Sequence, residues 1–358
     1  MEFIKPGINI DFIGRRQIGY IVSAILILVS IGTLIVNGGP EYGIDFQGGT
    51  IVQVKFDNAV DLSAIKSGLD EIGLGGAAVQ RFGDKEKNEY LVRTDRSLTT
   101  DDNFSARVKD ALSGATAADA EIRRVEMVGP QVGETLREKA LFALFYALLF
   151  ITIYISGRFE MKWMVSGVTA AALIGAVYFF GLFNLSIPLL ILVALIVTLI
   201  LFWQLRLKFA MGAVVALIHD VTITVGIFTL LGKEFSLPIV AALLTIIGYS
   251  LNDTIIVFDR IRENMKRYTR RPMESTINRS INETLSRTVL TSLTTLVVLL
   301  CLFFLGGDII HDFAFALIIG VLIGTYSSIY VASPMLLLLQ GPGTTPAAGQ
   351  AAEASAAS

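Results

Sequence analysis

The chain has 358 residues, of which 53% are hydrophobic and 17% are charged, and its net charge is −2 at pH 7. Soluble domains contain about 45–50% apolar and about 25% charged residues, and here the apolar excess lies in long runs, which excludes an ordinary soluble protein. The nearly balanced charge argues against a nucleic-acid partner. With one cysteine and two histidines, the chain has neither an internal disulfide nor a structural zinc site built from these residues.

Eight hydrophobic runs are long enough, or nearly long enough, to cross a bilayer, which takes about 20 apolar residues. Because backbone amides must be hydrogen-bonded within the chain in lipid, each run is expected to be a helix. The predicted spans are 18–36, 140–155, 163–182, 187–203, 209–231, 237–258, 288–305 and 313–339, the last seven forming a bundle over 139–339. The first run lacks a small-x-small cleavage pattern at its end and is interpreted as a retained span.

Lysine and arginine residues near the spans predict that both termini lie in the cytoplasm, since cytoplasmic loops carry an excess of these residues. With residues 1–17 inside, the inner segments include a strongly basic loop at 259–287, whereas the short outer loops contain only Lys233. Residues 37–138 then form an extracytoplasmic domain. The tail at 340–358 has no lysine or arginine and is expected to be disordered.

The extracytoplasmic domain has a soluble composition and an alternating pattern of strands and helices. The expected strands are 50–56, 78–82, 89–94 and 120–128, and the expected helices are 61–72 and 100–112. This βαββαβ order predicts a small ferredoxin-like α+β domain.

A glycine-rich turn, Gly43-Ile44-Asp45-Phe46-Gln47-Gly48-Gly49, precedes the first strand. No helix is expected after its glycines, which argues against a cradle for nucleotide phosphates. Two interpretations remain: a turn that only feeds the strand, or a hinge between the first span and the domain. The hinge would use Gly43, Asp45, Phe46, Gly48 and Gly49.

Two pairs of polar residues lie inside predicted spans, where a charge costs about 2.5–3.5 kcal/mol and marks a functional candidate. His219 and Asp220 lie near the middle of one span, and Asn252 and Asp253 lie near the cytoplasmic end of the next. Tyr249 shares the helix face of Asp253. His219 fits a polar packing residue as well as a relay member.

Arg287 opens the following span, and hydroxyl side chains continue its helix face, so Asp253 and Arg287 can belong to one polar track. Burial favours the protonated form of a carboxyl group, whereas a nearby arginine favours the carboxylate. An Asp253 whose partner moves away can therefore take up and release a proton. The alternative is a fixed Asp253–Arg287 pair that only holds the helices together.

Taken together, several motifs resemble the SecF family of bacterial protein-export membrane proteins, a part of the RND-like superfamily. They are residues 43–49, Ala216-Leu217-Ile218-His219-Asp220-Val221, the run from Ile247 to Asn264, residues 284–288 and residues 324–330. The resemblance covers most of residues 15–335. It implies a polytopic α-helical membrane bundle with a periplasmic α+β domain, in the bacterial inner membrane.

The resemblance further implies that the chain acts with SecD beside the Sec protein-conducting channel. There it would couple the proton motive force to late-stage translocation and release of unfolded preproteins. It assigns proton passage to Asp253 and Arg287, and it matches His219 and Asp220 to the family's His-Asp pair. The expected coupling ion is a proton, with sodium as an alternative, and no cofactor or metal is expected.

The chain departs from the family in having two additional spans, 163–182 and 187–203. Lys162-Trp163 is echoed by Lys208-Phe209, which suggests a duplicated hairpin. The duplicated copy lacks the polar residues of the later one, so we expect it to pack at the periphery of the bundle.

Two other functions remain as alternatives: a proton-coupled small-molecule exporter half of the RND-like superfamily, or a purely structural translocase subunit. An enzyme is not expected, since the sequence has no suitable nucleophile–base pair and no Walker-type phosphate loop. The basic loop 259–287 is long enough for an amphipathic helix that contacts anionic membrane lipid or a partner, and a solvated connector is the alternative.

Overall fold

The computed structural model describes residues 8–83, 87–94, 103–160 and 187–339, with isolated positions between 161 and 186. The chain forms two compact units. The helical unit consists of residues 1–40, 141–233 and 239–358, and the α+β unit consists of residues 41–140 and 234–238.

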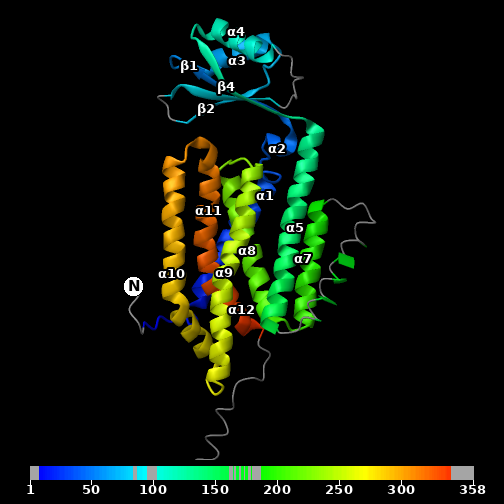
Figure 1. The fold of residues 1–358 in the computed structure, drawn as a ribbon, viewed down its shortest axis with the longest axis vertical. Coiled ribbons are helices and arrows are strands. Elements are labelled where there is room, and N and C mark those ends of the chain that lie inside the picture. The colour runs from blue at the N-terminus through cyan, green and yellow to red at the C-terminus, as the bar shows by residue number, and fades with distance from the viewer. Residues whose placement is uncertain are drawn as a thin grey trace, which may run out of the picture. The chain divides into compact units, whose positions relative to one another are not determined.

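The helical unit is built from long apolar helices, drawn in Figure 1. Its elements are α1 (Arg16–Val36), α5 (Pro130–Glu160), α7 (Ile187–Gln204), α8 (Lys208–Leu230), α9 (Leu237–Arg267), α10 (Met273–Leu305), α11 (Asp308–Ser327), a π-helical turn (Ser328–Ala332) and α12 (Ser333–Leu338). Within the described residues, six helical stretches are long and apolar enough to cross a membrane, and part of α7 is a shorter apolar helix. The expected helical membrane bundle is thus confirmed, while the predicted span 163–182 lies largely outside the described residues.

The basic segment 259–287, which the sequence showed to be long enough for an amphipathic helix, is mostly helical and belongs to α9 and α10. Helix α9 continues to Arg267 and α10 already begins at Met273, so only a short turn separates them. Polar bonds hold the two extensions together, among them Arg260 to Glu283 at 2.7 Å. Hydropathy marks only the apolar part of a helix, and a polar extension of the same helix leaves no such signal.

Small residues bring the helices of the bundle into close contact. Gly226 of α8 lies against Ser30 of α1, where a Cβ would overlap the serine side chain. Gly324 of α11 lies against Ser250 of α9, and a Cβ there would be 2.9 Å from the serine Cβ. Such close approach is how small residues promote helix packing in membranes. The contact between Gly324 and Ser250 places α11 beside α9, near the buried polar residues of the bundle.

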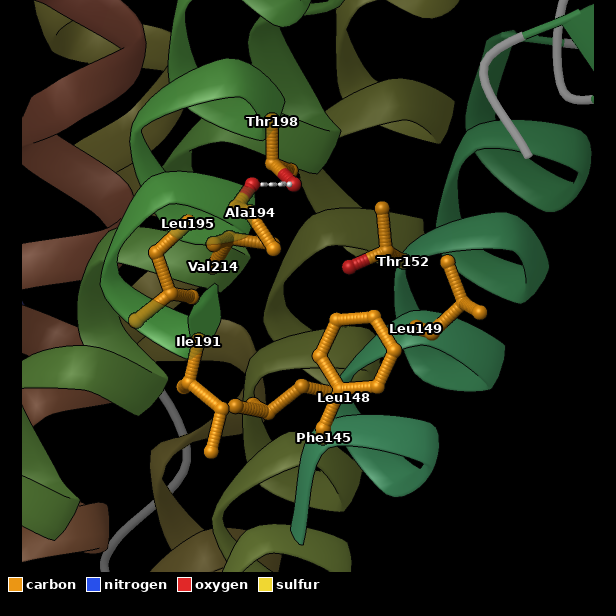
Figure 2. A pocket seen from close by; sticks show the side chains of 9 residues that line it. All are labelled: Phe145, Leu148, Leu149, Thr152, Ile191, Ala194, Leu195, Thr198 and Val214. Carbon is orange, nitrogen blue, oxygen red and sulfur yellow. Dashed lines mark hydrogen bonds between the residues drawn. The ribbon is translucent and has the colours of Figure 1, made fainter. Parts of the chain in front are cut away.

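Helix α7 packs on the apolar side of α5 and α8. Figure 2 shows a pocket between these three helices. The lining residues are Phe145, Leu148, Leu149, Thr152, Ile191, Ala194, Leu195, Thr198 and Val214. None of the predicted relay residues lines this pocket, which agrees with a peripheral place for the described helix of the suggested duplicated hairpin.

The α+β unit contains a four-stranded antiparallel sheet in the order β2-β3-β1-β4. The strands are β1 (Gly49–Phe56), β2 (Ala78–Phe82), β3 (Glu89–Thr94) and β4 (Ala120–Val128), and the helices are α2 (Ile44–Gln47), α3 (Leu62–Glu71) and α4 (Phe104–Thr116). Helices α3 and α4 lie on one face of the sheet (Figure 1). The predicted βαββαβ order and ferredoxin-like topology are confirmed.

The sheet has its own hydrophobic core, because alternate residues of its central strand point inward. Val52, Val54 and Phe56 of β1 are at most 2% exposed. They pack with Ile65 of α3 and Leu112 of α4. A separate cluster of buried side chains fills the helical unit.

Candidate functional site

A fully hydrogen-bonded cluster surrounds Asp220 in the bundle. His219 and Asp220 are 3% and 0% exposed, and the His219 Nδ1 and Asp220 Oδ1 atoms are 2.8 Å apart. The hydroxyls of Ser250 and Ser327 donate to Asp220 Oδ2 at 2.5 and 2.8 Å. His219 Nε2 lies 3.0 Å from Ser23 Oγ. The cluster joins α1, α8, α9 and α11, and complete satisfaction of a buried polar network rigidifies the core that contains it.

Asp253 has a very different environment, although it is equally buried, with 1% exposure. Among the described residues, its Oδ1 has no hydrogen-bond partner, and its Oδ2 is 3.5 Å from the Ser292 hydroxyl, at the limit of a hydrogen bond. Ser292 is 2.7 Å from Thr325, and the buried Thr288 hydroxyl also lacks a partner. Burying an ionised carboxylate without compensating hydrogen bonds costs free energy. The neutral acid avoids most of this cost because it carries no charge.

Arg287 and Asp253 form no ion pair among the described residues, so the fixed pair considered as an alternative is not seen. The Arg287 side chain is exposed. The physical reason is the helical period. Asp253 contacts Ser292 of α10, and Arg287 lies five residues before Ser292, which rotates it by about 140° around the helix axis. The guanidinium remains within electrostatic reach of the Asp253 carboxyl group.

The two other relay candidates on α9, Tyr249 and Asn252, form no hydrogen bond with the Asp253 carboxyl group among the described residues. Tyr249 contacts α10 through a 3.4 Å hydrogen bond from its hydroxyl to Thr295. Asn252 is exposed on the surface of the helix. The roles of Tyr249 and Asn252 in proton passage stay predictions.

The Asp220 and Asp253 clusters share two helices. On α9, Ser250 binds Asp220 and lies close to one turn before Asp253, so both side chains point to similar sides of the helix. On α11, Ser327 binds Asp220 and Thr325 binds the serine beside Asp253. The two carboxyl groups therefore have hydrogen-bonding neighbours on the same two helices.

Four serines that the sequence patterns did not single out contact the two carboxyl groups or His219: Ser23, Ser250, Ser292 and Ser327. Hydroxyl side chains are common in apolar helices, where they can bond the carbonyl oxygen of the preceding turn and then have no partner on another helix. The available signal was position, since Ser250 lies at helical spacing from Asp253 on the same face.

The glycine-rich turn packs against the start of α5. Gly48 and Gly49 have φ values of +76° and +125°, which favour glycine. A Cβ on Gly48 would lie 2.8 Å from the Pro130 Cα, and a Cβ on Gly133 would lie 2.8 Å from the Gly48 nitrogen. Phe46 is 4% exposed. The turn thus feeds β1 and is tightly packed, while its use as a hinge stays a prediction.

Two further residues of the turn contact the segment that joins α8 to α9. The Gly43 amide donates to the Phe235 carbonyl oxygen at 2.8 Å. The Leu237 amide donates to Asp45 Oδ2 at 2.9 Å. Both contacts lie within the α+β unit.

Two family profiles match the chain. The C-terminal domain of the protein-export membrane proteins SecD and SecF matches residues 107–200 and 173–341, and the SecD/SecF GG motif matches residues 33–60. The first profile thus matches the chain in two stretches that overlap at residues 173–200.

Curated relatives align over nearly the whole chain. Protein translocase subunit SecF of Magnetococcus marinus is 43% identical over 357 residues, which cover 99% of both chains. The SecF subunit of Calditerrivibrio nitroreducens is 39% identical, and the alignment covers 95% of this chain and 97% of the relative.

A solved structure of SecDF, a translocon-associated membrane protein from Thermus thermophilus, has a TM-score of 0.67 and 33% sequence identity. The match covers 93% of this chain and 39% of the SecDF chain, so the chain spans about two fifths of that protein. These similarities, the helical bundle and the packed GG turn agree with one another, and the chain belongs to the SecF family of protein-export membrane proteins.

Proposed function

We propose that the chain acts with SecD beside the Sec protein-conducting channel of the bacterial inner membrane. There it couples the proton motive force to late-stage translocation and release of preproteins, as a non-catalytic subunit. Family membership supports the export role. The observation that carries the coupling role is Asp253, a buried carboxyl group with one unpartnered oxygen among hydroxyl side chains of neighbouring helices.

In this mechanism, Asp253 is the group that changes charge. The protonated side chain is neutral and is therefore tolerated in a buried site with few hydrogen bonds. The ionised side chain instead attracts Arg287 of the adjacent helix. Each state favours a different arrangement of α9 and α10, so proton binding shifts the population of the two arrangements. The Asp220 cluster keeps α1, α8, α9 and α11 together during that shift.

The proposed orientation follows the distribution of basic residues. Both termini and the hairpin formed by α9 and α10 lie in the cytoplasm, and the α+β unit lies in the periplasm, where it contacts unfolded preprotein. The glycine-rich turn from Gly43 to Gly49 connects α1 to this unit and acts as its joint. The basic turn of the hairpin faces anionic lipid or a cytoplasmic partner.

The purely structural alternative has less support. It relies on a static Asp253–Arg287 pair, and the two side chains are not joined by an ion pair. A purely structural Asp253 would be expected to have saturated hydrogen bonds like those of Asp220. The small-molecule exporter alternative has no specific observation in its favour.

The test measures preprotein release from vesicles that contain the chain and its SecD partner, with and without an imposed proton gradient. We expect the gradient to accelerate release for the native chain and to have no effect for Asp253→Asn. The control is Asp259→Asn, on the same helix but exposed and paired with Arg158, which should retain the gradient effect. A sodium gradient of equal size separates the two candidate ions.

An equal gradient effect in Asp253→Asn, with normal amounts of the chain bound to SecD, would contradict the proposed coupling. Loss of the gradient effect in both variants would show that the loss is not specific to the buried site. Stimulation by sodium alone would assign the site to the other ion.

A further inference from the structure

The segment from residue 234 to residue 238 connects two membrane helices, yet it belongs to the α+β unit. Its backbone is bonded to the chain just before the glycine-rich turn. The Phe235 amide donates to the Glu41 carbonyl oxygen at 2.6 Å, and the Gly43 amide donates to the Phe235 carbonyl oxygen at 2.8 Å. Tyr42 and Phe235 form a parallel β-bridge. The segment is therefore held by one isolated β-bridge and its two backbone hydrogen bonds.

Two side chains of the α+β unit hold the same segment. Asp45 Oδ2 accepts the amide of Leu237, the first residue of α9, at 2.9 Å. A carboxylate at this position satisfies a free amide at the helix start and also complements the helix dipole. Arg93 of β3 forms an ion pair with Glu234 and donates to the Tyr42 carbonyl oxygen at 2.8 Å.

The close fit leaves little space for movement between the turn and the segment. A Cβ on Gly43 would lie 3.3 Å from the Phe235 carbonyl oxygen. The Arg93 side chain is 18% exposed and that of Glu234 is 33% exposed, so their ion pair is partly shielded from water. Partial burial strengthens such a pair relative to one on the open surface.

Helix α9 connects this anchored start to the proposed proton site. It runs without interruption from Leu237 to Arg267. Asp253 lies about 24 Å along its axis from Leu237, at about 1.5 Å per residue. Helix α5 also starts in the α+β unit, at Pro130, but none of the candidate relay residues lies on it.

We propose that the 234–238 segment is the coupling joint between the α+β unit and the proton site on α9, with Asp45 and Arg93 as its positioning residues. This proposal rests on the proposed function. A shift of α9 that follows the charge of Asp253 moves the segment, and the bonds to Asp45, Gly43 and Arg93 pass that movement to the α+β unit. Because coupling between two sites is reciprocal, the state of the α+β unit also changes the proton affinity of Asp253.

The test measures amide hydrogen exchange in the full chain with its SecD partner in lipid vesicles, over a peptide covering residues 41–49. The measured quantity is the ratio of exchange rates between Asp253→Asn and native chains. Coupling between sites typically changes an equilibrium about 5–150-fold, so we expect a ratio that differs from one by at least about fivefold. In the Asp45→Ala background the ratio should return to about one.

Two matched variants control this measurement. Asp45→Asn keeps an acceptor oxygen for the Leu237 amide and should keep most of the coupling. Asp61 caps α3 within the same unit, through the Ser63 amide at 3.3 Å, and among the described residues no hydrogen bond or ion pair joins it to the segment. Asp61→Ala therefore removes a comparable helix cap and should leave the ratio unchanged.

A ratio near one in the native background, or an unchanged ratio in Asp45→Ala, would overturn the coupling joint. The proposed function stands or falls separately, since it depends on whether gradient-driven release requires Asp253. If release requires Asp253 while the exchange ratio is one, the function is kept and the joint is rejected.

Discussion

Asp220 and Asp253 have the same side chain and similar burial, and they differ in their hydrogen bonds. Asp220 accepts from two serine hydroxyls and a histidine, whereas Asp253 has one long contact. A buried acceptor whose hydrogen bonds are all formed stabilises the fold, whereas an acceptor without a partner keeps the cost of its desolvation. Under the proposed function, Asp253 exchanges the proton and Asp220 holds the helices together, while a relay role of Asp220 stays a prediction.

This difference predicts opposite effects on stability. Asp220→Ala leaves His219, Ser250 and Ser327 without their acceptor and should lower the free energy of unfolding by about 3–5 kcal/mol, as for other broken buried networks. Asp253→Ala removes a group with few bonds and should cost less than about 2 kcal/mol. Denaturant unfolding of the purified chain in mixed micelles measures both values. Equal losses for the two variants would contradict the assignment.

The charged residues of the site could be found from sequence, and most of their partners could not. His219, Asp220 and Asp253 interrupt apolar runs, and the cost of such an interruption singles them out. Ser250 and Ser327 cause no comparable interruption, so only the fold shows that they bind Asp220. Whether Arg287 pairs with Asp253 depends on the angular positions of side chains around two packed helices, and spacing within one helix does not determine these positions.

At the scale of elements, hydrophobic patterns located the helices and misjudged their ends. Helices α9 and α10 extend beyond their apolar parts because bonds such as Asn264 to Ser280, at 3.0 Å, hold polar turns together. In the α+β unit, alternation of apolar residues correctly predicted four strands and their order along the chain. The pairing of β1 with both β3 and β4 depends on contacts between distant segments.

The glycine-rich turn gives a prediction at this scale. Gly48→Ala should destabilise the α+β unit by about 1–3 kcal/mol, because alanine is strained at a φ of +76° and its Cβ would contact the Pro130 backbone. Gly76→Ala is the matched control in the same unit, since a Cβ there meets nothing within 4 Å. Its effect should stay within about 0.5 kcal/mol. The denaturant dependence of amide exchange in β1 measures both, and similar losses would refute the packing argument.

At the scale of the whole molecule, two separate hydrophobic cores predict two separate unfolding units. Leu112 is completely buried in the core of the α+β unit, and Leu217 is 1% exposed in the core of the bundle. Leu112→Ala should lower the stability of the α+β unit by about 2–5 kcal/mol and leave exchange protection in α8 unchanged. Leu217→Ala should have the reverse effect, because a cavity weakens the core that contains it.

Hydrogen exchange with mass spectrometry reads both units from one sample of the full chain, so the comparison needs no excised domain. Leu62→Ala is the control for the size of the deletion, since Leu62 is 37% exposed at the start of α3 and contributes little to the core. If Leu112→Ala and Leu217→Ala each reduced protection in both units equally, the molecule would unfold as one cooperative body. Separate responses would mean that the α+β unit can open or reorganise while the bundle keeps its proton site intact, which a subunit that moves one part against the other requires.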